Sequence, residues 1–346
     1  MKKSTLIGII SASVVFVALL LVATFYDLQI SVALGNADSL FGQFFRLFGE
    51  ATGWIIVPLA GAILFCSTDK KTVIGRLLTI IWGIVVVVGW FLTVSYFIEE
   101  FTGDSYREGM YGSPYNALII YDIVFALIIS FLHVWIVGKV KKETLSKLVI
   151  FAIAMLIALA LSQIVTTVLK SIWTRQRFRN LDIGNGGTSS NGFTPWYIPG
   201  LGKNKEAALY YVEDAAGMTQ GDAYKSFPSG HTSAAAMSFI IVMLPDIFEK
   251  LKKYKVWFYV VPIVYTALVA VSRIVNRAHF LSDVLFGGTI GVLSVIAAIA
   301  ITKKLQSLCT RKKLFIKMKT VLCANADNFV SNSDNNDICT EDKAEN

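Results

Sequence analysis

Charged residues are scarce in this chain: they make up 16% of its 346 residues, against 55% that are hydrophobic. The mean hydropathy is +0.60. This composition argues against a soluble globular protein, because several apolar runs reach roughly 20 residues, the length that crosses a bilayer. The net charge of +8 does not indicate nucleic-acid binding, because the basic residues fall in short loops between these runs. We expect a polytopic helical membrane protein.

Cysteine and histidine are also rare, with four and three residues respectively. All four cysteines fall on the side that we assign below to the cytoplasm, so we expect free thiols and no disulfide framework. Acidic residues do not gather into a cluster suited to Mg²⁺, so we expect neither a metal nor another cofactor. The cysteines are Cys66, Cys309, Cys323 and Cys339, and the histidines are His133, His231 and His279.

The apolar runs predict an all-α transmembrane bundle of about eight spans. The first run is read as an uncleaved span, because it is long for the apolar part of a signal peptide and more spans follow. The second run is short and contains Pro58. The eight expected spans are residues 6–25, 54–66, 77–98, 117–137, 148–169, 231–245, 256–271 and 284–301.

Three parts follow from this arrangement. Residues 1–76 would form a two-span N-terminal extension, and residues 77–302 a six-helix core with a long outer loop at 171–230. Residues 303–346 would form a tail, basic at first and then polar, whose last twenty or so residues we expect to be disordered.

Basic residues set the expected orientation. The N-terminus, three Lys-rich turns and the tail belong to the cytoplasm by the positive-inside rule, and eight spans then place both termini inside. The loops at 99–116 and 170–230 fall outside. The second of these loops breaks the rule, because it contains Arg175, Arg177 and Arg179. A basic cluster on the outer side indicates that some of these charges bind a ligand.

The stretch from Ser272 to Asp283 contains an arginine, a histidine and an aspartate at short spacing. His279 and Asp283 are four residues apart and share one face of a helix, so the carboxylate can hold one imidazole nitrogen as N–H and leave the other as a nucleophile. Arg273 supplies a fixed positive fork that suits phosphate. The competing interpretation is a buried histidine satisfied by a nearby aspartate.

Two further polar clusters accompany this stretch. Lys170 and Arg177 lie at the outer end of the fifth span, where we favour anion binding; for Arg175 and Arg179 we favour interfacial snorkelling. The second cluster, residues 225–236, contains Ser229, Gly230 and His231 at a probable helix start, where exposed amides can bind phosphate oxygens. An ordinary helix cap followed by an interfacial histidine is the alternative. The third histidine, His133, is interpreted as structural.

Together the clusters read K-x6-R, PSGH and SR-x5-H-x3-D. They resemble the three-part signature of the phosphatidic acid phosphatase type 2 / haloperoxidase superfamily, over Lys170 to Asp283. The chain departs from it at Phe178, where the family usually has proline, and it adds a charge at Arg277.

The resemblance implies a role for each residue. His279 would attack phosphorus to form a phosphohistidine, Asp283 would orient it, and His231 would protonate the leaving oxygen. Phosphoryl transfer depends mostly on positioning and charge stabilisation, and cations and amides without acidic metal ligands imply a metal-independent enzyme. The residues implied in binding the phosphate oxygens are Lys170, Arg177, Ser229, Gly230 and Arg273.

The expected protein is therefore an integral-membrane phosphatase of the cell envelope, acting at the outer leaflet on a lipid phosphate or diphosphate. Undecaprenyl diphosphate, phosphatidate and phosphatidylglycerophosphate are substrates implied by the resemblance. Trp173, Phe178 and Trp196 would flank the headgroup. The alternatives are a phosphatase of soluble esters, a lipid phosphotransferase, and a non-catalytic lipid-phosphate transporter or receptor. The roles of Asp122 and of loop 180–224 stay open.

Overall fold

A computed structural model describes residues 3–102, 115–201 and 223–334 of the chain, and these residues contain helices but no strand. Eight helical segments are long and apolar enough to cross a membrane, which confirms the expected polytopic bundle. The segments are Leu6–Leu34, Leu40–Ser67, Val73–Glu100, Ile119–Gly138, Lys142–Asn185, Gly230–Ile247, Trp257–Val275 and Leu281–Leu308.

The principal helices follow the chain in the order α1 (Lys3–Leu34), α2 (Leu40–Phe48), α3 (Ala51–Ser67), α4 (Val73–Thr102), α6 (Tyr115–Gly138), α7 (Lys142–Trp173), α11 (Gly230–Ala236), α12 (Leu244–Ile247), α13 (Trp257–Val275) and α14 (Leu281–Asp334). Short 3₁₀ turns complete the set: η2 (Phe178–Asn180), η3 (Ile183–Asn185), η4 (Met237–Met243) and η5 (Glu249–Tyr254). The sixth expected span is thus three consecutive helical pieces, α11, η4 and α12.

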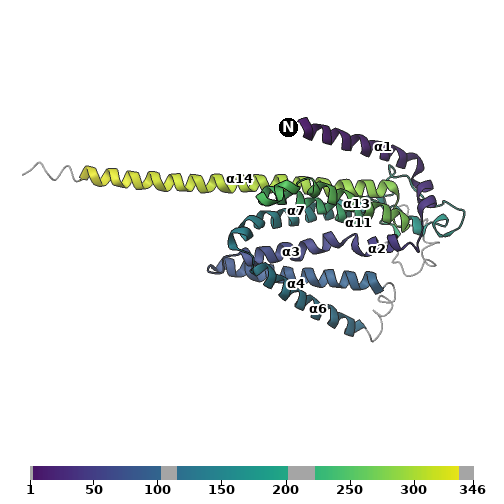
Figure 1. Cartoon of the computed structure of the whole chain (residues 1–346), viewed down its shortest axis with the longest axis horizontal. Helices are drawn as coiled ribbons and strands as arrows, with labels where there is room; N and C mark the ends of the chain where they lie inside the picture. The colour runs from purple at the N-terminus through teal and green to yellow at the C-terminus, as the bar shows by residue number, and fades with distance from the viewer. Residues whose placement is uncertain (1–2, 103–114, 202–222, 335–346) are drawn as a thin grey trace, which may run out of the picture. The chain divides into compact units, whose positions relative to one another are not determined.

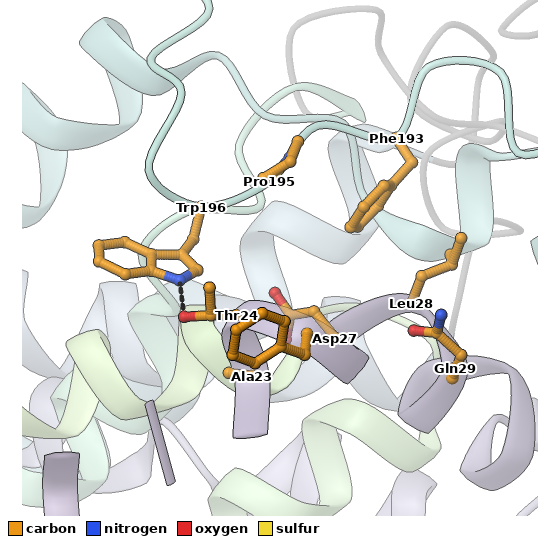
Figure 2. A pocket seen from close by; sticks show the side chains of 9 residues that line it. Ala23, Thr24, Asp27, Leu28, Gln29, Phe193, Pro195 and Trp196 are labelled. Carbon is orange, nitrogen blue, oxygen red and sulfur yellow. Dashed lines mark hydrogen bonds between the residues drawn. The ribbon is translucent and has the colours of Figure 1, made fainter. Parts of the chain in front are cut away.

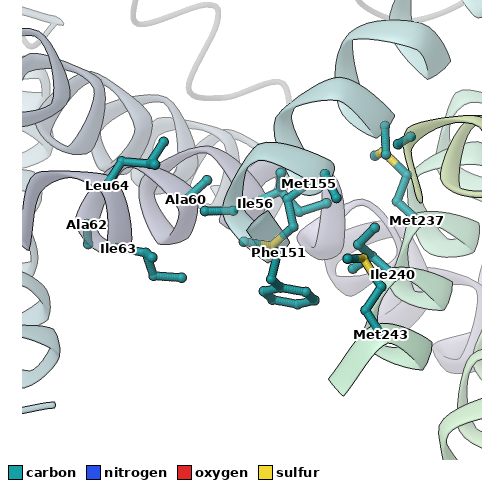
Figure 3. Packing of buried hydrophobic residues seen from close by; sticks show 14 of the residues in the cluster. Ile56, Ala60, Ala62, Ile63, Leu64, Phe151, Met155, Met237, Ile240 and Met243 are labelled. Carbon is teal, nitrogen blue, oxygen red and sulfur yellow. The ribbon is translucent and has the colours of Figure 1, made fainter. Parts of the chain in front are cut away.

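Helix α3 packs against α4 and α7, and α4 packs against α6 (Figure 1). The main hydrophobic core lies where α3, α7 and η4 meet, with Ile56, Phe151, Met155 and Ile240 among its buried residues (Figure 3). Most other large apolar side chains of the spans are exposed in the protein alone. In a membrane such side chains face lipid rather than water, so they do not weaken the fold.

Two glycines let α14 approach α11 closely. A Cβ at Gly287 would lie 2.3 Å from the carbonyl oxygen of Ser229, and one at Gly291 would lie 2.4 Å from that of Ser233. Small residues at such crossings allow backbones of membrane helices to come together. This contact brings the PSGH segment beside the beginning of α14.

Two polar residues of α6 have partners from the neighbouring helix α4. Asp122 on α6 is buried and accepts a hydrogen bond from Ser95 of α4 at 2.8 Å, so it is not simply hydrated. His133, also on α6, accepts one from Trp90 of α4 at 3.1 Å. This contact agrees with the structural role expected of His133.

Residues 1–299 and residues 300–346 form two compact units. Helix α14 extends to Asp334, so the tail is helical for some residues beyond the point where we expected disorder to begin. Residues 335–346 and part of the open loop 180–224, from 202 to 222, lie outside the described residues. The proposed division at residue 76 stays a prediction.

Candidate functional site

The three motifs lie together in the first unit, near the ends of α7, α11, α13 and α14. Thr174 ends α7 in the left-handed conformation (φ 39°), and its N–H donates to the carbonyl of Lys170 at 3.1 Å. This turn directs the following arginines away from the helix axis. The amide of Arg177 donates to the carbonyl of Ala223 at 2.9 Å, which ties the first motif to the segment that leads into the second.

His279 lies between α13 and α14 and is 1% exposed. Its Nδ1 lies 2.7 Å from the carbonyl oxygen of Ser226 and 3.6 Å from Oδ2 of Asp283. The first distance is that of a hydrogen bond and the second is too long for one. Nδ1 therefore carries the proton and donates to Ser226, which leaves Nε2 as a bare, nucleophilic nitrogen.

This geometry corrects part of the expectation for Asp283. Its carboxylate accepts from Arg175 Nη1 at 2.6 Å, from the hydroxyl of Ser226 at 2.5 Å and from the amide of Phe280 at 2.9 Å. The carboxylate thus organises the backbone around His279, while the carbonyl of Ser226 fixes the tautomer directly.

Burial holds the pKa of His279 well below its ordinary value. The positive charges of Arg177 and Arg273 act in the same direction, and the carboxylate of Asp283 opposes them. Because a lowered pKa keeps the imidazole neutral, its free nitrogen stays nucleophilic at neutral pH.

Arg273 is 2% exposed, and among the described residues its Nε and Nη1 have no hydrogen-bond partner. Its backbone carbonyl accepts from the amides of Ala278 and His279 at 3.1 and 3.2 Å, so the arginine and the histidine belong to one tight turn. Buried guanidinium donors without protein acceptors are costly unless a ligand satisfies them. The arrangement fits an anion beside His279.

The second motif offers fewer free backbone amides to an anion than expected. Ser229 caps α11 and its hydroxyl oxygen accepts from the amide of Thr232 at 3.4 Å. Its own N–H donates to the carbonyl of Asp283 at 3.0 Å, so this amide is already engaged within the protein. Gly230 begins the helix, and Lys170 Nζ and Glu50 Oε1 would lie 3.6 and 3.5 Å from a Cβ placed there.

His231 has a partner that the sequence did not indicate. Its Nδ1 lies 2.7 Å from Oε1 of Glu50, between α2 and α3, and its Nε2 lies 3.3 Å from the carbonyl oxygen of Arg46. Along the chain, no carboxylate stands at helical spacing from His231. The carboxylate comes instead from Glu50, which lies 181 positions earlier in the sequence.

Arg175 is a further correction, because it is buried rather than snorkelling. It is 1% exposed, and besides Asp283 it pairs with Asp27 of α1 through Nη2 at 2.9 Å. Its guanidinium also lies 4.2 Å from the ring centre of Phe280. Sequence reasoning missed Asp27; the available signal was an acidic residue directly after an uncharged apolar run.

Phe178 and Arg277 have structural contacts. Phe178, which stands where the family usually has proline, is 2% exposed and packs edge-on against Phe280, so it does not flank a headgroup. Arg277 donates to the carbonyls of Gly184 and Gly35 at 3.0 and 3.3 Å. These contacts hold the loop after α7 and the end of α1 around the third motif.

Comparison with known proteins agrees with this geometry. Residues 151–307 match the family model described as PAP2 superfamily. This region of the chain belongs to the PAP2 superfamily. No curated protein and no solved structure matches the chain. The PAP2 region starts within α7 and ends within α14, so it contains all three motifs, whereas Asp27 and Glu50 precede it.

Membership supports a phosphatase that acts on phosphate esters in a membrane-embedded helical protein. Within the described residues, no group of three or more His, Cys, Asp or Glu side chains could hold a metal ion. The polar groups that converge in the PAP2 region are instead cations, two imidazoles and one carboxylate with its hydrogen bonds satisfied.

Proposed function

We propose that the protein is an integral-membrane phosphatase that hydrolyses a lipid phosphate or diphosphate through a phosphohistidine on His279. The observation that carries the proposal is Arg273, which has two buried donors without a partner among the described residues and whose carbonyl accepts from the amide of the neutral His279. An anion that filled this position would satisfy the arginine and meet the histidine at once.

In the first step, Nε2 of His279 attacks phosphorus, and the bond from phosphorus to the leaving oxygen breaks. His231 gives its Nε2 proton to that oxygen. The contact of Nε2 with the carbonyl of Arg46, at 3.3 Å, is long and therefore easily exchanged for a substrate oxygen. In the second step, His231 takes a proton from water, whose oxygen bonds to phosphorus while the bond from phosphorus to Nε2 of His279 breaks. Phosphate is released and His279 is free again.

Lys170, Arg177 and Arg273 would hold the non-bridging phosphate oxygens with the amide of Gly230. Fixed positive charges in a site with little water stabilise the charge of the transition state more strongly than they would in solution. This electrostatic contribution needs no metal, so activity should survive EDTA and fall with vanadate. Strict dependence on Mg²⁺ would contradict the mechanism.

A lipid substrate is supported by the position of the site at the ends of spanning helices. Trp173 stacks on Phe227 with ring centres 4.9 Å apart, and Trp196 lies 5.1 Å from Phe286. Aromatic side chains of this kind gather at the level of the headgroups. Undecaprenyl diphosphate, phosphatidate and phosphatidylglycerophosphate are the candidates that we propose to compare.

The site is proposed to face the outer leaflet of the cell membrane, with both termini in the cytoplasm. The basis is the distribution of basic turns. Reporters fused after Lys142 and Lys253 should read cytoplasmic, and one after Gly202, which lies outside the described residues, should read external. A cytoplasmic reading at Gly202 would move the site to the inner leaflet.

The deciding experiment is release of phosphate from these three lipids by the purified protein in EDTA. Phosphate release would support hydrolysis. Transfer of phosphate to a second lipid would support a phosphotransferase, and tight binding without turnover would support a transporter or receptor.

A further inference from the structure

Two carboxylates that precede the PAP2 region lie near the histidines: Glu50 contacts His231 directly, and Asp27 is linked to the surroundings of His279 through Arg175 and Asp283. We propose that Asp27 and Glu50 are positioning residues, Asp27 for the His279 side of the site and Glu50 for His231, so that α1 to α3 are part of the catalytic unit. This inference rests on the proposed function, because it assigns roles within the same reaction.

The Asp27 side is a closed network of buried groups. Asp27, Arg175, Ser282 and Asp283 are 4%, 1%, 0% and 0% exposed. Asp27 accepts from Arg175 Nη2 at 2.9 Å and from the amide of Ser282 at 2.9 Å, and the hydroxyl of Ser282 bridges between Asp27 and Arg175. Arg175 uses its other terminal nitrogen for Asp283.

The chemistry of this network makes the guanidinium a rigid link. An arginine fork presents its donors in a fixed plane, so Asp27 on one nitrogen determines where the other nitrogen meets Asp283. Asp283 in turn holds the hydroxyl of Ser226, whose carbonyl accepts from His279. Asp27 therefore acts on the nucleophile through Arg175, Asp283 and Ser226.

Helix α1 reaches the site only near its C-terminal end. Between Leu6 and Leu34 most of its side chains are exposed, whereas Ala23, Asp27 and Ser31 are buried. Trp196 donates to the hydroxyl of Thr24 at 3.1 Å, beside a pocket of about 110 Å³ that Asp27 helps to line (Figure 2). Such a pattern, with exposed side chains along most of the helix and a buried acid near its end, is expected where the acid is the helix's main contribution to the site.

The Glu50 side is a direct contact. Glu50 precedes α3, and its carboxylate takes Nδ1–H of His231 at 2.7 Å. The negative charge beside Nδ1 favours the protonated ring that must donate to the leaving oxygen. The amide of Gly49 donates to the carbonyl of Phe45 at 2.9 Å, and Tyr96 donates to the carbonyl of Arg46 at 3.0 Å. The segment that carries Glu50 is therefore fixed by α2 and α4.

Replacing the two carboxylates should lower the reaction rate in different ways, and this difference provides the test. We would measure single-turnover rate constants at saturating enzyme in detergent, because an inactive fraction of the protein does not change them. The probes are 4-nitrophenyl phosphate, with a good leaving group, and dioctanoyl phosphatidate, with a poor one. The variants are Asp27→Asn and Glu50→Gln, and the controls are the exposed carboxylates in Asp38→Asn and Glu143→Gln.

Asp27→Asn should lower the rate constant with both probes by roughly 10- to 100-fold, the size typical of groups that orient a reacting centre indirectly. Glu50→Gln should lower it by a similar factor with phosphatidate and by less than about threefold with 4-nitrophenyl phosphate, because a proton donor matters least when the leaving oxygen is already stable. The controls should stay within about twofold of wild type, as expected for changes away from the reacting groups.

Ser282→Ala provides a second route if Asp27→Asn does not fold. It keeps both charges and the backbone contact to Asp27 and removes only the bridging hydroxyl, so we expect a loss of roughly 3- to 10-fold with both probes. Wild-type rates in folded Asp27→Asn, or in Ser282→Ala when Asp27→Asn does not fold, would overturn the role of Asp27. Equal losses with both probes in Glu50→Gln would overturn the role of Glu50.

The proposed function fails separately. If the wild-type protein releases phosphate from neither probe nor from the other candidate lipids, the phosphatase assignment is wrong, and this inference falls with it. If the wild-type protein is active and both variants behave like their controls, only the role of the N-terminal helices is wrong.

Discussion

His279 and His231 have different surroundings in the same site. His279 is 1% exposed and gives its Nδ1 proton to a backbone carbonyl, whereas the side chain of His231 is 13% exposed and gives its Nδ1 proton to a carboxylate. A carbonyl selects a tautomer without adding charge, and a carboxylate stabilises an added proton. The comparison teaches that the group accepting the Nδ1 proton suits His279 for attack on phosphorus and His231 for proton donation.

Replacing His279 with alanine would test this comparison most severely. Phosphate release should fall roughly 10⁴-fold or more, as it does when a covalent nucleophile is removed. Rapid acid quench with labelled substrate should find no acid-labile phosphohistidine. Label retained on His279→Ala but absent from His231→Ala would reverse the two roles, and His133→Ala is the matched control because that ring lies on α6.

Asp283→Asn separates the carboxylate from the tautomer. Because Ser226 rather than Asp283 accepts the Nδ1 proton, we expect a loss of roughly 10²–10³-fold, smaller than the roughly 10⁴-fold known for an aspartate that holds the imidazole directly. The measurement is kcat with phosphatidate, alongside thermal unfolding in detergent. A loss equal to that of His279→Ala would show that Asp283 contacts the ring during the reaction.

His231→Ala should distinguish leaving groups. With phosphatidate the rate should fall by roughly 10²–10⁴-fold, the usual contribution of a general acid, and with 4-nitrophenyl phosphate by much less. The measurement is the slope of log kcat against leaving-group pKa for a series of esters. An unchanged slope would remove His231 from the acid role.

Arg273→Gln tests whether the anion binds between the two histidines. The two donors of Arg273 that have no partner in the described part of the chain should serve the anion. Hydrogen bonds to charged groups are strong, so the dissociation constant of vanadate should rise roughly 10- to 100-fold. Titration calorimetry with orthovanadate measures it, with exposed Arg76→Gln as the control. Unchanged affinity would mean that the anion lies elsewhere.

The pH dependence gives the smallest expected effect. Burial lowers the pKa of His279, so the ring stays unprotonated as the pH falls through the ordinary histidine value of about 6.5. The acid limb of kcat should therefore lie below that pH. Measuring the profile with two esters whose phosphates have different pKa values separates ionisation of the enzyme from ionisation of the substrate. An acid limb near pH 6.5 with both esters would contradict a neutral, buried nucleophile.

Local spacing accounts for the part of the site that could be predicted. Apolar runs indicated all eight spans, because the bilayer requires such runs wherever a backbone crosses it, although the runs at 54–66 and 231–245 are short for a crossing. The motif residues are also close along the chain: Arg273 lies near the end of α13, His279 in the turn that follows and Asp283 in the first turn of α14, so short spacing brings them together. Ser229 shows the limit, since its amide is engaged by Asp283 from another helix.

The sequence alone determined the class of protein, its spans and the three motifs, because each depends on neighbours along the chain. Only the tertiary structure decided that Arg175 is buried, that Ser226 accepts from His279, and that Asp27 pairs with Arg175 and Glu50 with His231. These contacts join residues 53 to 181 positions apart. A buried charge is stable only beside its partner, and helix packing, rather than any local pattern, determines which partner is near.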